Sequence, residues 1–385
     1  MAGGAPRGPE MKTRRTVALA VLVAALTGVL GVPAAGAPPA PAPVAAPAAL
    51  PVRYVQADVV DVPVSFEVRN VNRSLNQCAV DGRPYTVRGY LTGPAALLDG
   101  PAPPAVTLYV HGTNTAQWIW RLPVEGHNFV QALAARGHVS VTIDRLGYGE
   151  NPVPDGFGTC TGGNADVAHQ VVEQLRAGAY HVEGRAPTAF GTVFMGGHSS
   201  GALVAELVAY SFGGIDGIVA TGWAGIGITD ETARRFFPMF DACQRGLLAS
   251  APPGPEADGY TYFDPTLADF YQASVSDEVD PRVREAMSAH HVRSPCGVML
   301  SEPIAIMEDL THLDRVDVPV LLVYGAADTL RQGVEPYAGL FVASPDVSET
   351  TVPGAGHIML IDVNASMVYD AVADWLSRQQ DRRNG

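Results

Sequence analysis

Lysine is almost absent from this chain, since Lys12 is the only one among 385 residues. Lys12 lies in an N-terminal segment that we expect to be removed, which leaves the mature protein with none. This absence excludes Schiff-base chemistry, a serine–lysine dyad and a P-loop lysine. Charge is also scarce, because 17% of the residues are charged and the formal net charge is −14. This net negative charge argues against binding to nucleic acid or anionic membrane surfaces, which call for basic patches.

Cysteine is equally scarce, with four residues at Cys78, Cys160, Cys243 and Cys296. None belongs to a CxxC pair and the chain has no HExxH motif, so we expect no metal and no cofactor. An even number of cysteines in an exported chain favours disulfides. Three pairings are possible. We favour Cys78–Cys160 and Cys243–Cys296, because the second pair falls within one inserted segment.

The first fifty residues have the composition of an export signal and a linker. A basic stretch from Met11 to Arg15 precedes an uncharged apolar run at 16–32 and small residues at 34–37. This order predicts a cleaved signal peptide over 1–37, with Met11 as an alternative start, and hence a secreted protein. The alternative is an uncleaved anchor, because a run of about 17 residues is at the lower limit for a membrane-spanning helix. Residues 38–51 are rich in Pro and Ala and predict an extended linker.

From residue 52 onward, short β-type runs alternate with stretches of helical periodicity. A leading antiparallel pair is expected at 52–68 and 85–91, and further strands at 105–110, 139–143, 192–195, 215–221, 318–324 and 348–352. Helical spacing follows around 129–134, 168–175, 203–208 and 368–376. This alternation predicts an α/β fold, a mostly parallel sheet with helices on both faces.

One interval, 222–317, breaks the alternation. A structureless loop of about 90 residues is implausible in a compact domain, so we expect an inserted, mainly helical cap at the carboxyl edge of the sheet. The core would then comprise 52–221 and 318–385.

The strongest motif is Gly197-His198-Ser199-Ser200-Gly201, between an apolar strand and an apolar helix. A serine on so sharp a turn needs small neighbours on both sides, and its hydroxyl then points out at the top of the sheet. Ser199 is therefore the candidate nucleophile. The alternative is an ordinary glycine-rich turn, in a chain with 41 glycines.

A serine nucleophile needs a base and an acid that orients the base. In this topology the chain order is serine, acid, histidine, with each residue just past a strand. Asp328 follows the strand ending at 324 and His357 follows the one ending at 352, which makes them the candidate acid and general base. Asp230 and Glu231, after the fourth strand, are alternative acids.

The reaction also needs donors for a developing oxyanion. We expect one donor to be the N–H of Ser200, directly after the nucleophile. The other is expected in the loop His111-Gly112-Thr113-Asn114, with Thr113 as first choice and Asn114 as second.

Aromatic side chains are the candidates for substrate contact. They could face a substrate of medium size and apolar character, or simply pack the cap against itself and the core. The candidate substrate-binding residues are Trp118, Phe236, Phe240 and Tyr262.

The chain resembles the α/β-hydrolase superfamily, in its capped serine esterase-like branch, over about residues 85–380. The resemblance rests on HG at 111–112, DRLGYG at 144–149, GHSSG at 197–201, GAAD at 325–328 and GAGH at 354–357. It implies acyl transfer to Ser199 and then attack by water activated by His357. A serine in place of aspartate argues against haloalkane dehalogenases and epoxide hydrolases.

The expected function is therefore that of a secreted serine hydrolase that cleaves a small or medium carboxylic ester or lactone. Three alternatives remain open: a peptidase or amidase, a secondary-metabolite tailoring esterase or acyl transferase, and a non-catalytic binding protein of the same fold. Pocket shape and water access, which the motifs do not specify, separate them.

Overall fold

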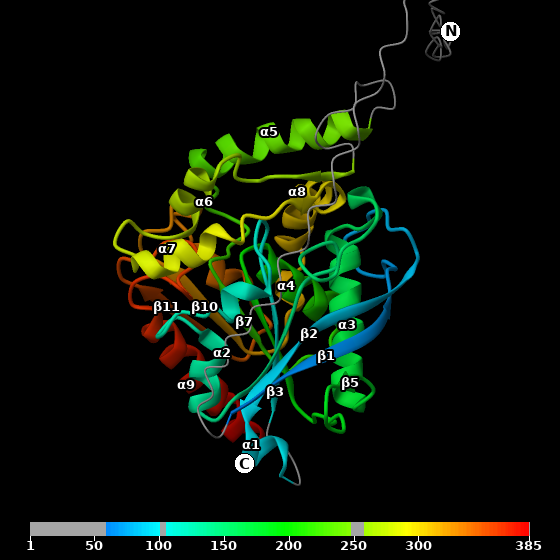
Figure 1. Cartoon of the computed structure of the whole chain (residues 1–385), viewed down its shortest axis with the longest axis vertical. Helices are drawn as coiled ribbons and strands as arrows, with labels where there is room; N and C mark the ends of the chain where they lie inside the picture. Colours follow the sequence, from blue (N-terminus) through cyan, green and yellow to red (C-terminus); the bar gives the residue numbers. More distant parts are fainter. Residues whose placement is uncertain (1–58, 101–104, 248–257, 385) are drawn as a thin grey trace, which may run out of the picture. The chain divides into compact units, whose positions relative to one another are not determined.

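The computed structural model describes residues 59–100, 105–247 and 258–384, so the expected signal peptide and linker lie outside the described residues. Within this part, a nine-stranded sheet has the order β11-β10-β7-β6-β3-β4-β2-β1-β5 (Figure 1). The strands are β1 (Val59–Arg69), β2 (Pro84–Pro94), β3 (Val106–Val110), β4 (Val139–Ile143), β5 (His181–Val182), β6 (Val193–His198), β7 (Ile218–Thr221), β10 (Val320–Gly325) and β11 (Val347–Val352).

The six strands from β4 to β11 in this order run parallel, and β2, β1 and β5 add antiparallel partners at one edge. The predicted mostly parallel sheet is thereby confirmed. The strand expected at 215–221 starts only at Ile218. Before it, Gly214 has a left-handed φ of 77°, and the side chain of Asp216 accepts the N–H of Val193. The two-residue strand β5 was not expected.

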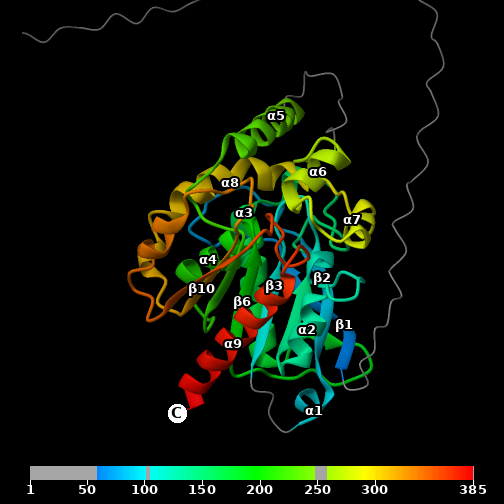
Figure 2. The ribbon, with the colours of Figure 1, turned by 90° about the vertical axis from the view of Figure 1, so that its left-hand side faces the viewer.

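Helices cover both faces of the sheet, and the side-chain alternation of the strands explains how. In β3, Val106, Leu108 and Val110 pack into one hydrophobic cluster while Tyr109 packs into another. The first cluster includes α3 (Thr161–Ala177) and α4 (Ser200–Phe212), and the second includes α2 (Phe129–Ala135) and α9 (Ala365–Asn384). Figure 2 shows α2 and α9 in front of the sheet. Successive residues of a strand point to opposite faces, so one apolar run serves both layers.

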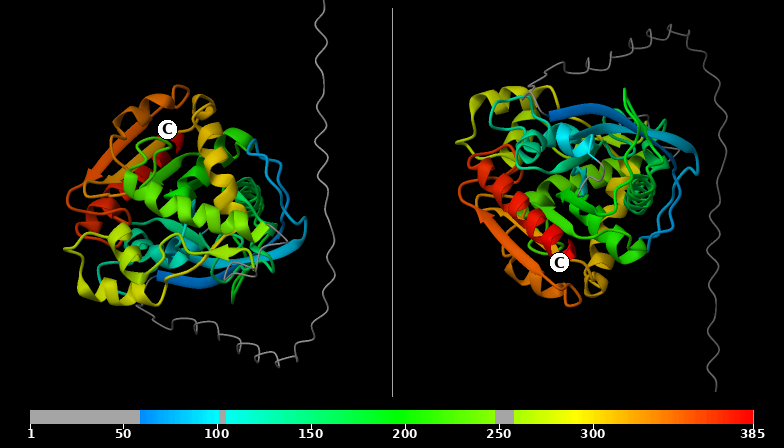
Figure 3. Two further views of the ribbon diagram at one scale, coloured as in Figure 1. Left: turned by 90° about the horizontal axis from the view of Figure 1, so that it is seen from above. Right: turned by 90° about the horizontal axis from the view of Figure 1, so that it is seen from below.

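The interval between β7 and β10 is mainly helical. It contains α5 (Asp230–Leu247), α6 (Leu267–Ser274), α7 (Pro281–Ser288), α8 (Cys296–Asp309) and a two-stranded sheet of β8 (Tyr260–Thr261) and β9 (Ser294–Pro295). These elements lie over one end of the sheet, seen from above in Figure 3. The shorter elements elsewhere are α1 (Ala95–Leu98) and 3-10 turns at Gln117–Trp120, Gly156–Gly158, Leu313–Arg315 and Glu335–Leu340.

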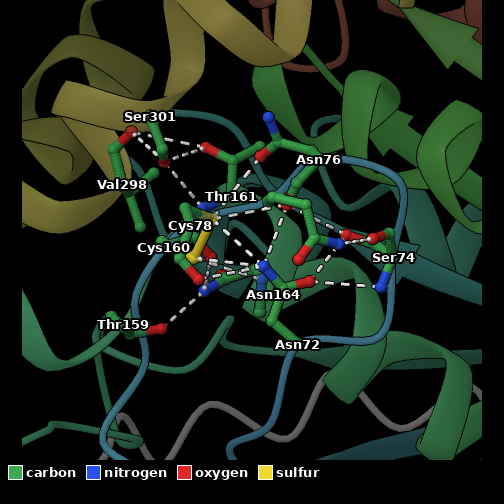
Figure 4. Close-up of a disulfide and its surroundings, with 12 residues drawn as sticks. Asn72, Ser74, Asn76, Cys78, Thr159, Cys160, Thr161, Asn164, Val298 and Ser301 are labelled. Atoms are coloured by element: carbon green, nitrogen blue, oxygen red, sulfur yellow. Dashed lines mark hydrogen bonds between the residues drawn. A yellow bond between two sulfur atoms is a disulfide. The ribbon is translucent and has the colours of Figure 1, made fainter. Parts of the chain in front are cut away.

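Two disulfides join distant parts of the described chain, Cys78–Cys160 and Cys243–Cys296. These are the pairs favoured from the sequence. Cys78–Cys160 ties the loop between β1 and β2 to the start of α3, where Ser301 of α8 also accepts the N–H of Thr161 at 2.9 Å (Figure 4). Cys243–Cys296 ties α5 to the first residue of α8.

The other end of α8 is held by two buried acids. Asp309, its last residue, and Glu206 of α4 are both fully buried. The Tyr337 hydroxyl lies 3.0 Å from Glu206 Oε2 and 2.9 Å from Asp309 Oδ2, and Trp223 Nε1 donates to Glu206 at 2.9 Å. Burial raises the pKa of both carboxyl groups, and that of Asp309 to about 7.

A membrane-spanning helix is not found in the described part of the chain, because none of its helices is both long and apolar enough. The apolar run at 16–32 lies outside that part.

Candidate active site

Ser199 occupies a strained turn between β6 and α4. Its φ of 52° and ψ of −128° lie where side-chain-bearing residues are rarely found. The turn requires glycine on both sides: a Cβ on Gly197 would lie 2.3 Å from the Ala202 nitrogen, and one on Gly201 would lie 2.4 Å from the Val110 oxygen. The GxSxG spacing is therefore required by backbone contact, and it places Ser199 at the end of a buried strand.

Asp328 and His357 meet at the ends of β10 and β11. His357 Nδ1 lies 2.8 Å from Asp328 Oδ2, and both side chains are buried. Asp328 also accepts the N–H groups of Leu330 at 2.7 Å and Arg331 at 3.2 Å. Burial alone would raise the pKa of Asp328, but the charge and hydrogen bond of His357, the N–H of Leu330 and the charge of Arg331 hold it below the usual value. Asp328 is thereby kept as a carboxylate that orients His357.

The alternative acids are not at this position. Glu231 forms ion pairs with Arg234 and Arg235 on α5. Asp230 begins the same helix, and only Asp328 among the three hydrogen-bonds His357 within the described residues.

His198, inside the GxSxG motif, contacts His357 through a hydrogen bond. This role was not identified from the sequence. His198 Nε2 donates to the backbone oxygen of His357 at 3.0 Å, and the two rings are 4.9 Å apart. Burial lowers the pKa of His198 to about 3, so the ring stays neutral.

The loop after β3 approaches the nucleophile closely. A Cβ on Gly112 would lie 2.9 Å from the Cβ of Ser199, so only glycine fits there. The next residue, Thr113, places its hydroxyl 2.9 Å from the hydroxyl of Ser200. Within the described residues the N–H groups of Thr113 and Ser200 have no hydrogen-bond acceptor. Thr113 and Ser200, the two residues expected to supply the oxyanion donors, are thus in contact with each other beside Ser199.

Asn114, the second choice, is engaged elsewhere. Its N–H donates to Ser294 at 3.1 Å and its side-chain amide donates to Asp264, which forms an ion pair with Arg235. Asn114 has a left-handed φ of 54°, and these contacts with the helical insertion fix the loop at that conformation. Thr113 is the better candidate donor for this reason.

The loop after β4 supports the same region. His111 accepts the N–H of Arg145 at 3.0 Å, and Arg145 Nη1 donates to Ser200 at 3.1 Å. Asp144 accepts the N–H groups of Gln117 and Glu150, and burial raises its pKa to about 6. These residues hold loops in place rather than face the nucleophile.

A cavity of about 370 Å³ contains Ser199 and His357 on its floor and residues of α5 and α8 on its walls. Most of its lining is apolar, including Phe236, Phe263, Pro303, Ile306 and Leu330. It opens to solvent beside Ile228, Phe237 and Met307, which are 52%, 67% and 71% exposed. A cavity of this kind suits a small or medium apolar ligand.

Of the four aromatic residues predicted to contact substrate, the cavity lining includes Phe236 alone. Trp118 is turned into the core, where its ring stacks on His290 at 5.0 Å. Phe240 lies one helical turn beyond Phe236 and stacks on it at 5.7 Å, outside the cavity. Tyr262 is 42% exposed and stacks on His291. The structure thus places three of the four candidates outside the cavity lining.

The cavity lining also includes two charged residues that were not identified from the sequence, Glu302 and Arg331. Glu302 lies in the middle of α8, and Arg331 follows three residues after Asp328. Only the position of Arg331 in the loop after β10 could have suggested its place. A potential metal site is not present among the described residues, since no three histidine, cysteine or acidic residues cluster suitably.

Comparison with known proteins agrees with this geometry. Residues 107–375, well over half of the sequence, match the model of the alpha/beta hydrolase family. The chain belongs to that family. A comparison with curated proteins finds no significant match.

Solved alpha/beta hydrolase structures share the fold at low sequence identity. A monoacylglycerol lipase from Paleococcus ferrophilus matches with a TM-score of 0.54 and 18% identity, over 71% of this chain and 94% of the other. A thermophilic esterase from Thermogutta terrifontis matches with a TM-score of 0.55 and 16% identity, over 82% and 99%. Rv0554 from Mycobacterium tuberculosis matches with a TM-score of 0.54 and 19% identity, over 78% and 97%. At such identities these likenesses establish the fold, and the chemistry of this alpha/beta hydrolase has to be argued from its own site.

Proposed function

We propose that the protein is a serine hydrolase that cleaves a small or medium carboxylic ester or lactone. Ser199 Oγ attacks the carbonyl carbon while His357 Nε2 takes its proton, and Asp328 stabilises the imidazolium. The negative charge that develops on the carbonyl oxygen is stabilised by hydrogen bonds that the N–H groups of Thr113 and Ser200 donate to it. His357 then gives its proton to the leaving alcohol oxygen, and the acyl group remains on Ser199.

Water completes the cycle. His357 takes a proton from water as its oxygen attacks the acyl carbon, and collapse of the second tetrahedral intermediate returns this proton to Ser199 Oγ and releases the acid. The opening of the cavity beside Ile228 and Phe237 supports hydrolysis over acyl transfer, because water can enter there.

The observation that carries the proposal is the 2.8 Å contact between Asp328 and His357 at the floor of a cavity that also contains the strained Ser199. A structural histidine would not need a buried carboxylate, a nucleophile elbow and a substrate-sized apolar cavity together.

Labelling with a fluorophosphonate probe tests the nucleophile. The wild-type protein should be labelled once, and Ser199→Ala should lose both the label and ester hydrolysis, with kcat lower by more than about 10⁴-fold. Ser288→Ala, an exposed serine on α7, is the matched control and should still be labelled. Labelling that persists in Ser199→Ala would show that Ser199 is not the nucleophile.

The bond class is tested with a p-nitrophenyl ester and the p-nitroanilide of the same acid. We expect the ester to be hydrolysed far faster. A preference for the anilide would instead favour the peptidase or amidase alternative, and the absence of both labelling and turnover would favour a non-catalytic binding protein.

Export is proposed as well. The order of basic, apolar and small residues over 1–37 and the two disulfides of the described chain support it. Mass spectrometry of the protein recovered outside the producing cell should find an N-terminus near residue 38. An intact N-terminus in the membrane fraction would favour the anchor.

A further inference from the structure

Two charged side chains face the otherwise apolar substrate cavity. Glu302 enters it from α8, and Arg331 enters it from the loop after β10. Each lies near enough for its charge to shift the pKa of the other. Yet no ion pair within 4.0 Å joins them in the part of the chain that the structure describes. A gap therefore separates an acidic and a basic group inside the cavity.

Neither group is fully satisfied by the protein. Glu302 Oε2 accepts a long hydrogen bond of 3.3 Å from the Thr113 hydroxyl, and among the described residues nothing donates to its Oε1. Arg331 donates through Nε to the Ala224 oxygen and through Nη1 to the Leu330 oxygen, both at 3.1 Å. Its Nη2 has no acceptor within the same residues. One oxygen and one nitrogen thus remain available to a ligand in the cavity.

The guanidinium of Arg331 is held in place before any ligand arrives. Besides its two backbone acceptors, it lies over the ring of Trp223 at 5.0 Å. Placing ionisable groups in an apolar cavity costs free energy unless they are paired. Burial accordingly raises the pKa of Glu302, against the opposing charges of Arg145 and Arg331. A purely apolar substrate would leave this cost unrelieved.

We propose that Glu302 and Arg331 form a polar subsite that binds a hydroxyl group of the substrate, which makes hydroxyl-bearing esters the preferred class. A hydroxyl is neutral and can donate to the Glu302 carboxylate while it accepts from Arg331 Nη2. A carboxylate would be repelled by Glu302, and an ammonium group by Arg331. This inference rests on the proposed function of Ser199 and extends it to the substrate.

The test uses two pairs of esters in which a methyl group replaces a hydroxyl. Propyl butanoate and 2-hydroxyethyl butanoate differ on the alcohol side, and methyl 3-methylbutanoate and methyl 3-hydroxybutanoate differ on the acyl side. The readout is the ratio of kcat/KM within each pair, which does not depend on the fraction of active protein. The wild-type protein should prefer the hydroxyl member of at least one pair by about 10-fold or more, as expected for a hydrogen bond to a charged group.

Variants of the subsite should remove this preference. Glu302→Leu deletes the acceptor and should bring the ratio close to one, while Glu302→Gln, which keeps an acceptor oxygen, should restore part of it. Arg331→Met should also lower the ratio. The matched control is Glu308→Leu, which changes the same residue type on the same helix outside the cavity lining and should keep the preference.

The outcomes separate the two proposals. If the wild type hydrolyses the apolar esters but shows less than about a twofold preference in both pairs, or if the preference survives in Glu302→Leu, the subsite is overturned while the proposed function stands. If the wild type hydrolyses none of the four esters, the proposed function is refuted and the subsite falls with it.

Discussion

The disulfide Cys243–Cys296 connects the two helices that form the walls of the cavity. Thr232, Phe236 and Phe237 of α5 line one side, and α8 lines the other. Both sulfurs are fully buried in a small hydrophobic cluster. The informative change is therefore the double substitution Cys243→Ala and Cys296→Ala, which opens the bridge without burying a hydroxyl group.

The expected loss follows from the length of the closed loop. A sequence separation of 53 residues corresponds to about 4 kcal/mol of unfolding free energy when the cross-link is removed. Urea denaturation of the wild type and the variant measures it. Because α5 is then free to separate from α8, KM for p-nitrophenyl butanoate should rise about fivefold, a loss of roughly 1 kcal/mol of substrate contact. The value of kcat should change less, since Ser199 and His357 lie on the core.

The other disulfide provides the control. Cys78→Ala with Cys160→Ala opens a loop with a separation of 82 residues, so its cost in unfolding free energy should be similar, again about 4 kcal/mol. That bridge lies away from the cavity lining, so KM should stay at the wild-type value. An equal rise of KM in both variants, or no rise on opening Cys243–Cys296, would refute the idea that this bridge sets the shape of the cavity.

Two further predictions concern the floor of the site and the attachment of α8. Gly112→Ala places a Cβ 2.9 Å from the Ser199 Cβ, so kcat/KM should fall by about 10²-fold or more. The circular dichroism spectrum should stay that of the folded protein. Activity near the wild-type level would contradict the close approach of the two residues. Glu206 and Asp309 have raised pKa values in the folded protein. Between about pH 4 and 7 the folded state therefore binds more protons than the unfolded chain. The unfolding free energy should fall in this range by about 1 kcal/mol for each unit of rising pH. Glu206→Gln should flatten this dependence in urea titrations at pH 5 and pH 8, and an unchanged slope would show that the pair does not cause it.

The fold and the catalytic candidates could be predicted because both depend on local patterns. Apolar runs of five or six residues that end in glycine or a polar residue identify the strands. Ser199, Asp328 and His357 each follow such a run, and parallel strands bring their carboxyl ends to one edge. For that reason the structure brings Ser199 and His357 to one cavity and places Asp328 against His357 outside the cavity lining. Their chemical roles remain proposals that the labelling and kinetic experiments test.

The cavity could not be predicted, because its lining depends on side-chain directions within the insertion. Phe236 and Phe240 are four residues apart on α5 and look equivalent in the sequence, yet only Phe236 reaches the cavity. Glu302 looks like an ordinary surface glutamate, and nothing around it in the sequence marks a contact with Thr113. Trp118 is an aromatic residue of the kind expected in a pocket wall, but its ring stacks on His290, which is more than 170 positions away in the sequence.

Helix α8 is attached at both ends and faces the substrate in between. The disulfide holds its first residue, Cys296, and the buried carboxyl cluster holds its last, Asp309. Between these points, Glu302, Pro303 and Ile306 line the cavity. The middle of α8 is therefore suited to protein engineering. Residues 302–307 can be varied in a mutant library to change substrate preference, while the residues that attach the helix and the catalytic residues stay unchanged.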